Sequence, residues 1–301
     1  MNTEEFVEVD LDSDGNILAP KNDKIALIDA DTLVYISCLN CQYEVSPLPW
    51  EMEEAQEKPN WNEDLGVWYD IDLDEVYKVA KNKIQKILDK TGCKDYELHF
   101  TDNTKTNFRY TFYPDYKANR KNIIRPAGLA ELKELLVKDG KSYTHQLWEA
   151  DDIVVMKKRL YPDNYILVAV DKDVLNAIEG KHFNYYESTK YNIQPKWIEI
   201  EAKHAKMWPY YQTIIGDKSD NIIGPKGIGP KRAAKFVNEN MTEKEMWEGV
   251  VKAYESKGLA EFDAILNMNL VNMNLLDEKE DKIIIRKWQP NFNDKGEHIW
   301  N

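Results

Sequence analysis

Apolar segments that end in acidic residues recur along this chain, and they constrain its fold more than any other feature. The segments are KIALIDA (24–30), YELHFTD (96–102), YTHQLWEA (143–150) and YILVAVDKD (165–173). Apolar runs of this length are typical of buried strands in a parallel sheet. Helical periodicity separates them at 31–42, 73–91 and 149–161. The alternation between 24 and 187 predicts an α/β fold, with a mostly parallel central sheet flanked by helices.

The acids at these positions are expected to meet. Parallel strands end at one edge of their sheet, where α/β folds build their sites. Asp171 and Asp173 are expected to point to the same side of an extended segment, and Glu149 and Asp152 are one helical turn apart. Asp217 and Asp220 are three residues apart and could face the same metals. The nine candidate metal ligands are Asp29, Asp102, Glu149, Asp151, Asp152, Asp171, Asp173, Asp217 and Asp220.

Carboxylates gathered in a cleft repel one another and require cations. Oxygen ligands at this density select Mg²⁺ or Mn²⁺, and we expect two ions per site. Two such ions suit the hydrolysis of a phosphodiester bond, because they activate water and stabilise the charge on the phosphate. The acids therefore predict a metal-dependent hydrolase.

A glycine-rich basic segment, GPKGIGPKRA (224–233), follows the last acids. It contains Lys226, Gly227, Gly229, Lys231 and Arg232 and no acid. Glycines let backbone N–H groups approach a phosphate, and a helix that begins near Pro230 adds its positive end. We interpret the segment as a clamp for a nucleic-acid backbone, independent of base sequence.

A second basic segment, FRYTFYPDYKANRKNIIR (108–125), mixes cations with aromatic residues. Its candidate DNA-binding residues are Arg109, Tyr116, Lys117, Arg120 and Lys121. Basic residues between aromatic ones suit single-stranded DNA, whose bases can stack. The alternative is a solvated helix whose aromatic residues belong to the core.

The net charge of −13 opposes DNA binding unless the acids are segregated. Residues 1–23 hold seven acids and one lysine, and residues 44–75 hold eleven acids and one lysine, so the rest of the chain is weakly basic. We expect an acidic flexible tail at 1–23, an α/β nuclease domain at 24–200 with an acidic insertion at 43–70, and a helical region at 201–301.

Six motifs of this chain occur in an order that resembles the flap endonuclease superfamily. They are LIDADTL, FTDN, YPDYKANR, EADD, AVDKDVL and IIGDKSDNIIGPKGIGPKRA. The resemblance is strongest to compact stand-alone phage 5′–3′ exonucleases, over roughly 24–240. It implies that Asp29, Asp102, Glu149, Asp151 and Asp152 serve one metal and that Asp171, Asp173, Asp217 and Asp220 serve the second. It also implies a helical arch at 112–145, with Lys117 and Arg120 on the scissile phosphate and Tyr116 as a stacking residue.

The same resemblance makes GPKGIGPKRA a helix–three-turn–helix, or helix-hairpin-helix, that grips duplex DNA, with K⁺ among its carbonyls. The implied enzyme is a 5′–3′ exonuclease or flap endonuclease with Lys117, Arg120, Asp151 and Asp171 as catalytic residues. Its substrate is DNA with a 5′ end or flap, with RNA–DNA hybrids as a further candidate. A polymerase or single-strand-binding protein would act in trans.

Three alternatives remain at this point. A phosphatase of the haloacid-dehalogenase type would use Asp29 as its nucleophile but leave EADD and AVDKD unused. A small-RNA nuclease of the PIN type would leave the glycine-rich segment unused. A DNA-binding protein without catalysis would be expected to lose some acids, whereas all nine positions are Asp or Glu.

Three cysteines are too few for a disulfide framework, and Cys38 and Cys41 are expected to be reduced thiols on a helix. No apolar run reaches the length of about 18 residues that a membrane span needs, and the N-terminus does not resemble a signal peptide. We expect a soluble intracellular protein with no membrane partner, in the host cytoplasm if it is phage-encoded.

Overall fold

The computed structural model describes residues 18–58, 60–102, 105–120 and 123–300. Within them the largest sheet has six strands in the order β5–β4–β1–β6–β7–β8, and only the β7–β8 pair is antiparallel. The strands are β1 (Asn22–Asp29), β4 (Cys93–Thr101), β5 (Ser142–His145), β6 (Tyr165–Val168), β7 (Gly180–Asn184) and β8 (Lys196–Ile200). The predicted α/β class with a mostly parallel sheet is confirmed.

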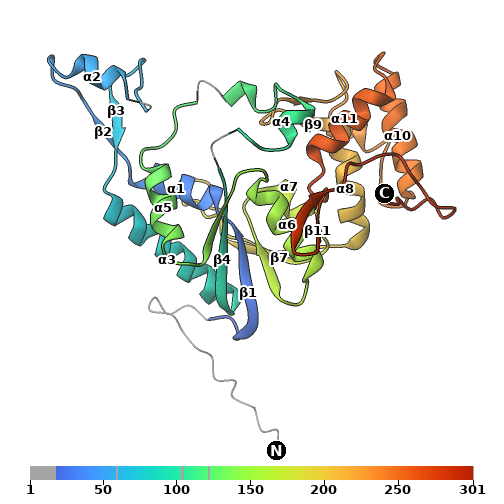
Figure 1. Ribbon diagram of the computed structural model, residues 1–301, viewed down its shortest axis with the longest axis horizontal. Coiled ribbons are helices and arrows are strands. Elements are labelled where there is room, and N and C mark those ends of the chain that lie inside the picture. The colour runs from blue at the N-terminus through green and yellow to red at the C-terminus, as the bar shows by residue number, and fades with distance from the viewer. Residues whose placement is uncertain (1–17, 59, 103–104, 121–122, 301) are drawn as a thin grey trace, which may run out of the picture.

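Helices cover both faces of this sheet (Figure 1). The central strand β1 is apolar on both sides: Ala26 and Ile28 belong to one core cluster, and Leu27 belongs to another. The first cluster includes residues of α1 (Asp31–Cys41), α3 (Leu73–Thr91) and α5 (Leu129–Val137), and the second those of α6 (Ala150–Leu160) and α7 (Lys172–Asn176). Burial on both sides explains why the strand is a continuous apolar run.

The long helix α3 shows how local sequence sets these boundaries. Asp72 caps its N-terminus by accepting hydrogen bonds from the N–H groups of Asp74 and Glu75. Gly92 ends it at φ +69°, where a Cβ would lie 2.1 Å from the Pro20 carbonyl oxygen. Only glycine fits that close approach, which brings the chain directly into β4.

The N-terminal segment joins the sheet earlier than expected. Ala19 N–H donates to the Asp89 carbonyl at 2.9 Å, and Asn22 N–H donates to the Gly92 carbonyl at 2.8 Å. The expected tail of residues 1–23 is therefore wrong at its C-terminal end. Residues 1–17 lie outside the described part of the chain.

The expected arch at 112–145 is too long. After α4 (Arg109–Phe112) and a 3₁₀ turn at Ala118–Arg120, the chain enters α5, whose Leu132 and Leu136 are fully buried in the core with α1 and α3. This apolar stripe holds α5 on the sheet. The next element, β5, is a strand of that sheet. Of the expected arch, the described residues between α4 and α5 cross above the carboxyl edge of the sheet (Figure 1).

The C-terminal region has its own core. It is built from α8 (Ala202–Ile215), α9 (Pro230–Ala233), α10 (Glu243–Glu255) and α11 (Glu261–Val271), which pack against Ile153 and Met156 of α6. A short ladder, β9 (Gly216–Asp217) with β10 (Ile222–Ile223), follows α8. A hairpin, β11 (Leu276–Lys279) with β12 (Lys282–Ile285), lies in the region expected to be helical.

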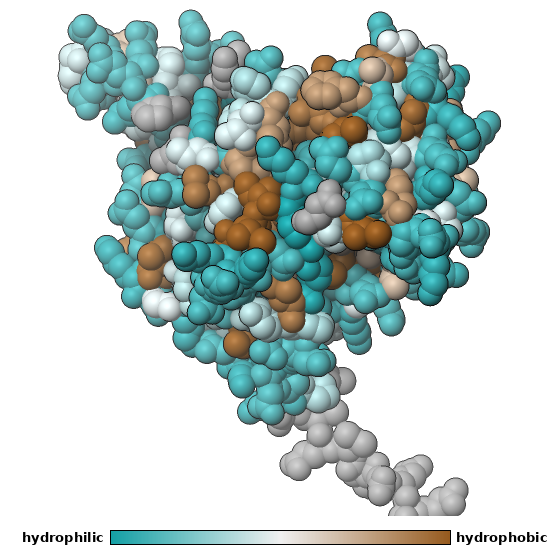
Figure 2. Space-filling view, turned by 45° about the vertical axis from the view of Figure 1, so that its right-hand side comes forward, coloured by the Kyte–Doolittle hydropathy of each residue, from teal (hydrophilic) through white to brown (hydrophobic). Residues whose placement is uncertain are grey.

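The acidic 43–70 segment forms an ordered excursion. β2 (Tyr43–Val45) and β3 (Trp68–Asp70) pair antiparallel at its base, and α2 (Met52–Gln56) lies between them. We call residues 43–70 the hairpin excursion. It projects from the molecule at the upper left of Figure 1, and Figure 2 shows its largely hydrophilic surface.

Cys38 and Cys41 carry free thiols on α1, as predicted, with Cys38 buried and Cys41 half-buried. Over the described ranges, no helix combines the length and apolar character needed to cross a bilayer.

Candidate active site

A cavity of about 1360 Å³ lies at the carboxyl edge of the sheet. Eight of the nine predicted acids line it: Asp29, Asp102, Glu149, Asp151, Asp171, Asp173, Asp217 and Asp220. The α/β domain supplies the first six, and the β9–β10 segment supplies the last two. Acids that are far apart in the sequence therefore meet in one space, as the strand-end argument predicts.

Several of these carboxyls are poorly compensated. Burial, together with the neighbouring Asp31 and Asp171, raises the pKa of Asp29 to about 8. Burial and then Asp171 raise the pKa of Asp173 to about 7, and burial followed by Glu149 raises that of Asp151 well above its usual value. The buried Oδ1 atoms of Asp29 and Asp173 have no hydrogen-bond partner. Like charges in a shielded space produce these shifts, and a bound cation would relieve them.

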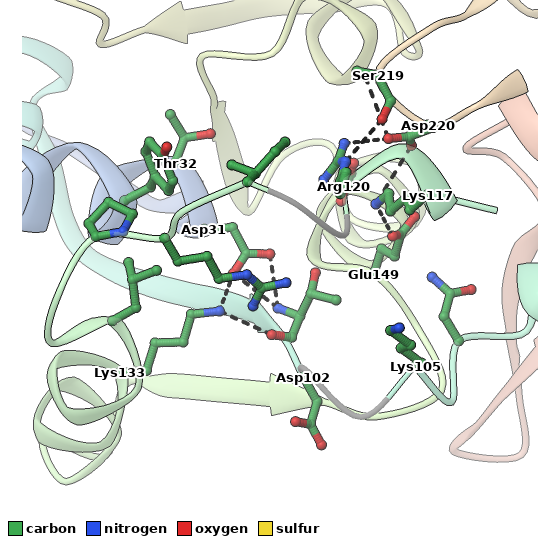
Figure 3. A pocket seen from close by; sticks show the side chains of 18 of the residues that line it. Asp31, Thr32, Asp102, Lys105, Lys117, Arg120, Lys133, Glu149, Ser219 and Asp220 are labelled. Carbon is green, nitrogen blue, oxygen red and sulfur yellow. Dashed lines mark hydrogen bonds and ion pairs between the residues drawn. The ribbon is translucent and has the colours of Figure 1, made fainter. Parts of the chain in front are cut away.

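Protein cations partly fill this role at one end of the cavity (Figure 3). The Lys117 ammonium donates to Glu149 Oε1 and lies 3.6 Å from Asp220 Oδ2. Arg120 donates to Asp220 Oδ1 and to the Ser219 carbonyl. Burial alone would raise the pKa of Glu149, but Lys117 and Arg109 lower it to about 2. Glu149 is therefore ionised, unlike Asp29 near neutral pH.

The structure corrects the role expected for Arg109 and Asp152. Arg109 is 2% exposed, so it presents no surface to DNA. Its Nη1 and Nη2 donate to Asp152 Oδ2 and Oδ1 at 2.5 and 2.7 Å, and its Nε donates to the Leu270 carbonyl at 2.7 Å. Asp152 is fully buried and does not line the cavity, because both of its oxygens face this guanidinium. Asp152 supports the site as an ion-pair partner and is not placed to bind a metal.

Tyr116 is also buried, at 2% exposure, and is not available for stacking on a base. Its hydroxyl lies 2.7 Å from Glu149 Oε2 and 2.8 Å from Asp220 Oδ2. The sequence alternative, in which the aromatic residues belong to the core, is correct here. Tyr116 links an acid of the α/β domain to an acid of the C-terminal region.

Asp102 and Asp31 lie at the other end of the cavity. Figure 3 shows the Asp102 carboxylate directed away from the Lys117–Glu149–Asp220 group. Asp31, which was not among the nine predicted acids, lines the cavity and accepts hydrogen bonds from Lys133 Nζ at 2.6 Å and from Thr101 N–H. Its position two residues after Asp29 in LIDADTL could have identified it.

Asp171 and Asp173 reach the cavity for a different reason from the one expected. β6 ends at Val168, and Asp171 is the N-cap of α7, accepting a hydrogen bond from Asp173 N–H at 2.7 Å. The prediction that both acids lie on an extended segment is wrong. A single helical turn brings the two carboxyls to the cavity.

Two close backbone contacts lie just before and at the start of the glycine-rich segment. A Cβ on Gly216 would lie 2.4 Å from the Ile222 carbonyl oxygen, and one on Gly224 would lie 2.1 Å from the Ile214 carbonyl oxygen. Glycine at both positions allows the tight β9–β10 ladder. A helix does begin at Pro230, as predicted, but α9 has only four residues.

The cationic side chains of this segment remain accessible. Lys226, Lys231 and Arg232 are exposed, and Arg232 donates to the Gly227 carbonyl at 2.9 Å. Gly227 has φ +80°, which suits glycine, and Gly229 is the N-cap of α9. Lys121, predicted to bind DNA, lies outside the described residues.

The donor set fits a hard divalent cation, since carboxylate oxygens predominate and two buried ones lack partners. In the part of the chain that the structure describes, however, no three His, Cys, Asp or Glu side chains are already arranged to hold a metal. Lys117 and Arg120 occupy the oxygens of Glu149 and Asp220 in this conformation. Glu149 and Asp220 could therefore offer these oxygens to a metal only after Lys117 and Arg120 move.

Comparisons with known proteins agree with this arrangement, although no family model matches the chain. It is 32% identical over 172 residues to a thermostable DNA polymerase I of Thermus aquaticus, covering 54% of this chain and 20% of that protein. It is 26% identical over 211 residues to the flap endonuclease Xni of Shewanella baltica, covering 61% of this chain and 79% of that protein.

The fold is that of the T5 5′-exonuclease, solved with bound zinc. That structure aligns with a TM-score of 0.57 at 17% identity, covering 83% of this chain and 89% of that one. The resemblance to 5′-nucleases is confirmed. The chain spans only about a fifth of the length of its DNA polymerase I relatives, so activity and substrate rest on the geometry of the site.

Proposed function

We propose that the protein is a metal-dependent 5′-nuclease that hydrolyses DNA phosphodiester bonds as a 5′–3′ exonuclease or flap endonuclease. The observation that carries this proposal is the set of eight acids lining one cavity beside the cations Lys117 and Arg120. The sequence similarity to the flap endonuclease Xni supports the same reaction.

Divalent ions, most simply two Mg²⁺ or Mn²⁺, would be held by Asp29, Asp151, Asp171 and Asp173, with Glu149, Asp217 and Asp220 close by. Such ions supply Lewis acidity that lets water attack a phosphodiester. Asp102 lines the same cavity and is a further candidate ligand, although its carboxylate points away from the Lys117–Glu149–Asp220 group (Figure 3). This reaction needs no side-chain nucleophile, and the product would carry a 5′-phosphate.

Lys117 and Arg120 would hold the scissile phosphate. Burial alone would lower the pKa of Lys117, but Glu149 and Asp220 raise it, so the ammonium stays charged. When a phosphate enters, Lys117 can exchange a carboxylate for a phosphate oxygen without losing its ionic partner. That exchange would also free Glu149 oxygens for cations and stabilise charge that develops on the phosphate.

Duplex DNA would be held by Lys226, Lys231 and Arg232 with the backbone of 216–233, where K⁺ is a candidate ligand of the carbonyls. These cations are exposed and independent of base sequence. RNA in an RNA–DNA hybrid is a further candidate substrate, and a polymerase or single-strand-binding protein a candidate partner in trans.

The test is cleavage of 5′-labelled flap DNA with and without Mg²⁺, followed by single-turnover rates and binding for Lys117→Ala. We expect cleavage only with metal, and a Lys117→Ala variant whose rate falls by about 100-fold while its affinity changes much less. Metal-independent binding without any cleavage would support a non-catalytic binder instead. Phosphate release from a small phosphomonoester, with the DNA intact, would support a phosphatase.

The phosphatase is disfavoured by the state of Asp29. A nucleophilic aspartate must be ionised and accessible. Asp29 is 4% exposed, and burial raises its pKa to about 8.

A further inference from the structure

The hairpin excursion borders the candidate active site, although none of the nuclease motifs lies in it. Lys58, Asn60, Trp68 and Tyr69 of the excursion line the same cavity as the acids. The β2–β3 ladder holds its base in place, with Val45 paired to Trp68. The excursion is therefore a wall of the cavity as well as a projection from the surface.

Charge is divided unequally over this excursion. It contains eight acids and a single lysine. Of the acids, Asp70 alone is found on the cavity lining among the described residues, whereas the lysine, Lys58, does line it. Lys58 Nζ lies 5.2 Å from the centroid of the Trp68 ring. The face toward the cavity thus offers a cation and an indole, and the remaining acids repel phosphate elsewhere.

Two residues of the α/β domain add the same chemistry to this cavity. Tyr35 of α1 lines it and is 38% exposed, and Lys133 of α5 lines it with its ammonium near Asp31 and the Thr101 carbonyl. We call Tyr35, Lys58, Trp68 and Tyr69 the aromatic wall. Aromatic rings with nearby ammonium groups bind single-stranded DNA without base preference, because every base has a face that can stack.

The position of the wall fixes what it would meet. Figure 1 shows β9, which precedes the glycine-rich segment, on one side of the carboxyl edge of the sheet, and the excursion on the other. A strand that leaves a duplex held at 216–233 crosses the acids and Lys117 before it reaches the excursion. The next chemistry that it encounters is the aromatic wall.

We propose that the aromatic wall binds the single-stranded 5′ segment of the DNA, with Trp68 and Tyr35 stacking on bases and Lys58 contacting a phosphate. This inference rests on the proposed nuclease function, since it assumes a strand that enters the cavity. It assigns a substrate-positioning role to residues of the excursion.

The experiment compares binding of two DNAs in EDTA, where chemistry is blocked. One is a duplex with a single-stranded 5′ tail carrying 2-aminopurine, and the other is the same duplex without a tail. Trp68→Ala and Lys58→Ala are expected to weaken binding of the tailed DNA by about 10-fold and leave the untailed duplex unchanged. Trp68→Ala should also restore 2-aminopurine fluorescence that stacking quenches in the wild type.

Trp50→Ala is the matched control, because Trp50 belongs to the same excursion, is 77% exposed and does not line the cavity. It should leave both affinities at the wild-type value. Trp68→Phe, which keeps a stacking ring, should retain most of the tail-dependent affinity and covers the case in which Trp68→Ala does not fold.

The proposal would be overturned if Lys58→Ala and the Trp68 variants bound the tailed DNA with the affinity of the wild type. An equal loss for tailed and untailed DNA would also overturn it. These outcomes differ from failure of the nuclease function, which is an absence of metal-dependent cleavage by the wild type. If the protein binds the tail through Trp68 but does not cleave DNA, the role of the aromatic wall is supported and the nuclease function is contradicted.

Discussion

Arg109 and Asp152 form a buried two-point ion pair directly behind the candidate active site, with Nη–Oδ distances of 2.5 and 2.7 Å. The same guanidinium lies 3.1 Å from Glu149 Oε2 and donates to the Leu270 carbonyl of α11. One side chain therefore connects α4, α6 and α11. It compensates two acids and fixes the C-terminal region against the sheet.

Arg109→Met should destabilise the protein by roughly 3–5 kcal/mol, because Asp152 is left buried without its cation. Chemical denaturation followed by circular dichroism measures this free energy of unfolding. Lys141→Met is the control, since Lys141 pairs with Asp95 at the surface with side chains 46% and 38% exposed, and its loss should cost under about 1 kcal/mol. Similar stabilities for the two variants would show that the buried pair contributes little.

Asp171→Asn should lower the rate of DNA cleavage by about 100-fold or more and leave DNA binding equal or tighter, because a negative charge is removed beside the phosphate path. Single-turnover cleavage and fluorescence anisotropy measure the two quantities. Asp163→Asn, at an exposed position just before β6, should change neither. An Asp171→Asn enzyme that cuts at the wild-type rate would contradict the proposed site.

The stability of metal-free protein should decrease between pH 7 and pH 9. Asp29 and Asp173, with pKa values raised to about 8 and about 7, bind protons in the folded state that they have lost in the unfolded state. Stability is therefore lost as pH rises toward these values, and the decrease levels off once the pH passes about 8. The histidines with lowered pKa, such as His145 at about 4, act below this window, where stability rises with pH.

Mg²⁺ should reverse this decrease, because it binds the ionised carboxylates and releases their protons. Thermal unfolding at several pH values, with EDTA or with Mg²⁺, gives the comparison. We expect the stabilisation by Mg²⁺ to grow from pH 7 to pH 9, and Asp29→Asn to flatten the metal-free decrease. A Mg²⁺ effect that is independent of pH would argue against binding at these acids.

Lys231→Ala should weaken binding of duplex DNA and reduce the slope of log K against log salt by about 1, as for the loss of one phosphate contact. The rate of cleavage at saturating DNA should stay unchanged. Lys279→Ala, on the exposed end of β11, is the matched surface control. An unchanged salt slope in Lys231→Ala would remove this residue from the DNA interface.

The convergence of the acids was predictable because it depends on topology. Once 24–30 and 165–173 are recognised as parallel strands, Asp29 and Asp171 must lie near the same edge. The backbone rule places the acids without knowledge of side-chain partners. It fails only in detail, as at Asp173, where a helical turn replaces the expected extended segment.

The roles of Arg109 and Tyr116 were not predictable in this way. Both belong to a segment whose composition suits DNA, and only tertiary packing shows that they are buried against Asp152, Glu149 and Asp220. A buried cation and an exposed one give the same local pattern in the sequence. The apolar stripe of α5 was visible, yet its burial depends on α1 and α3, which come from elsewhere in the chain.

The acids of the cavity are contributed in order along the chain, from Asp29 in β1 to Asp220 between β9 and β10. During synthesis, the α/β half of the cavity emerges from the ribosome before Asp217 and Asp220 exist. Until then Lys117 and Arg120 lack their partner at position 220, and Tyr116 lacks one of its two acceptors. A nascent chain that has not yet reached Asp220 therefore cannot assemble the complete set of charges.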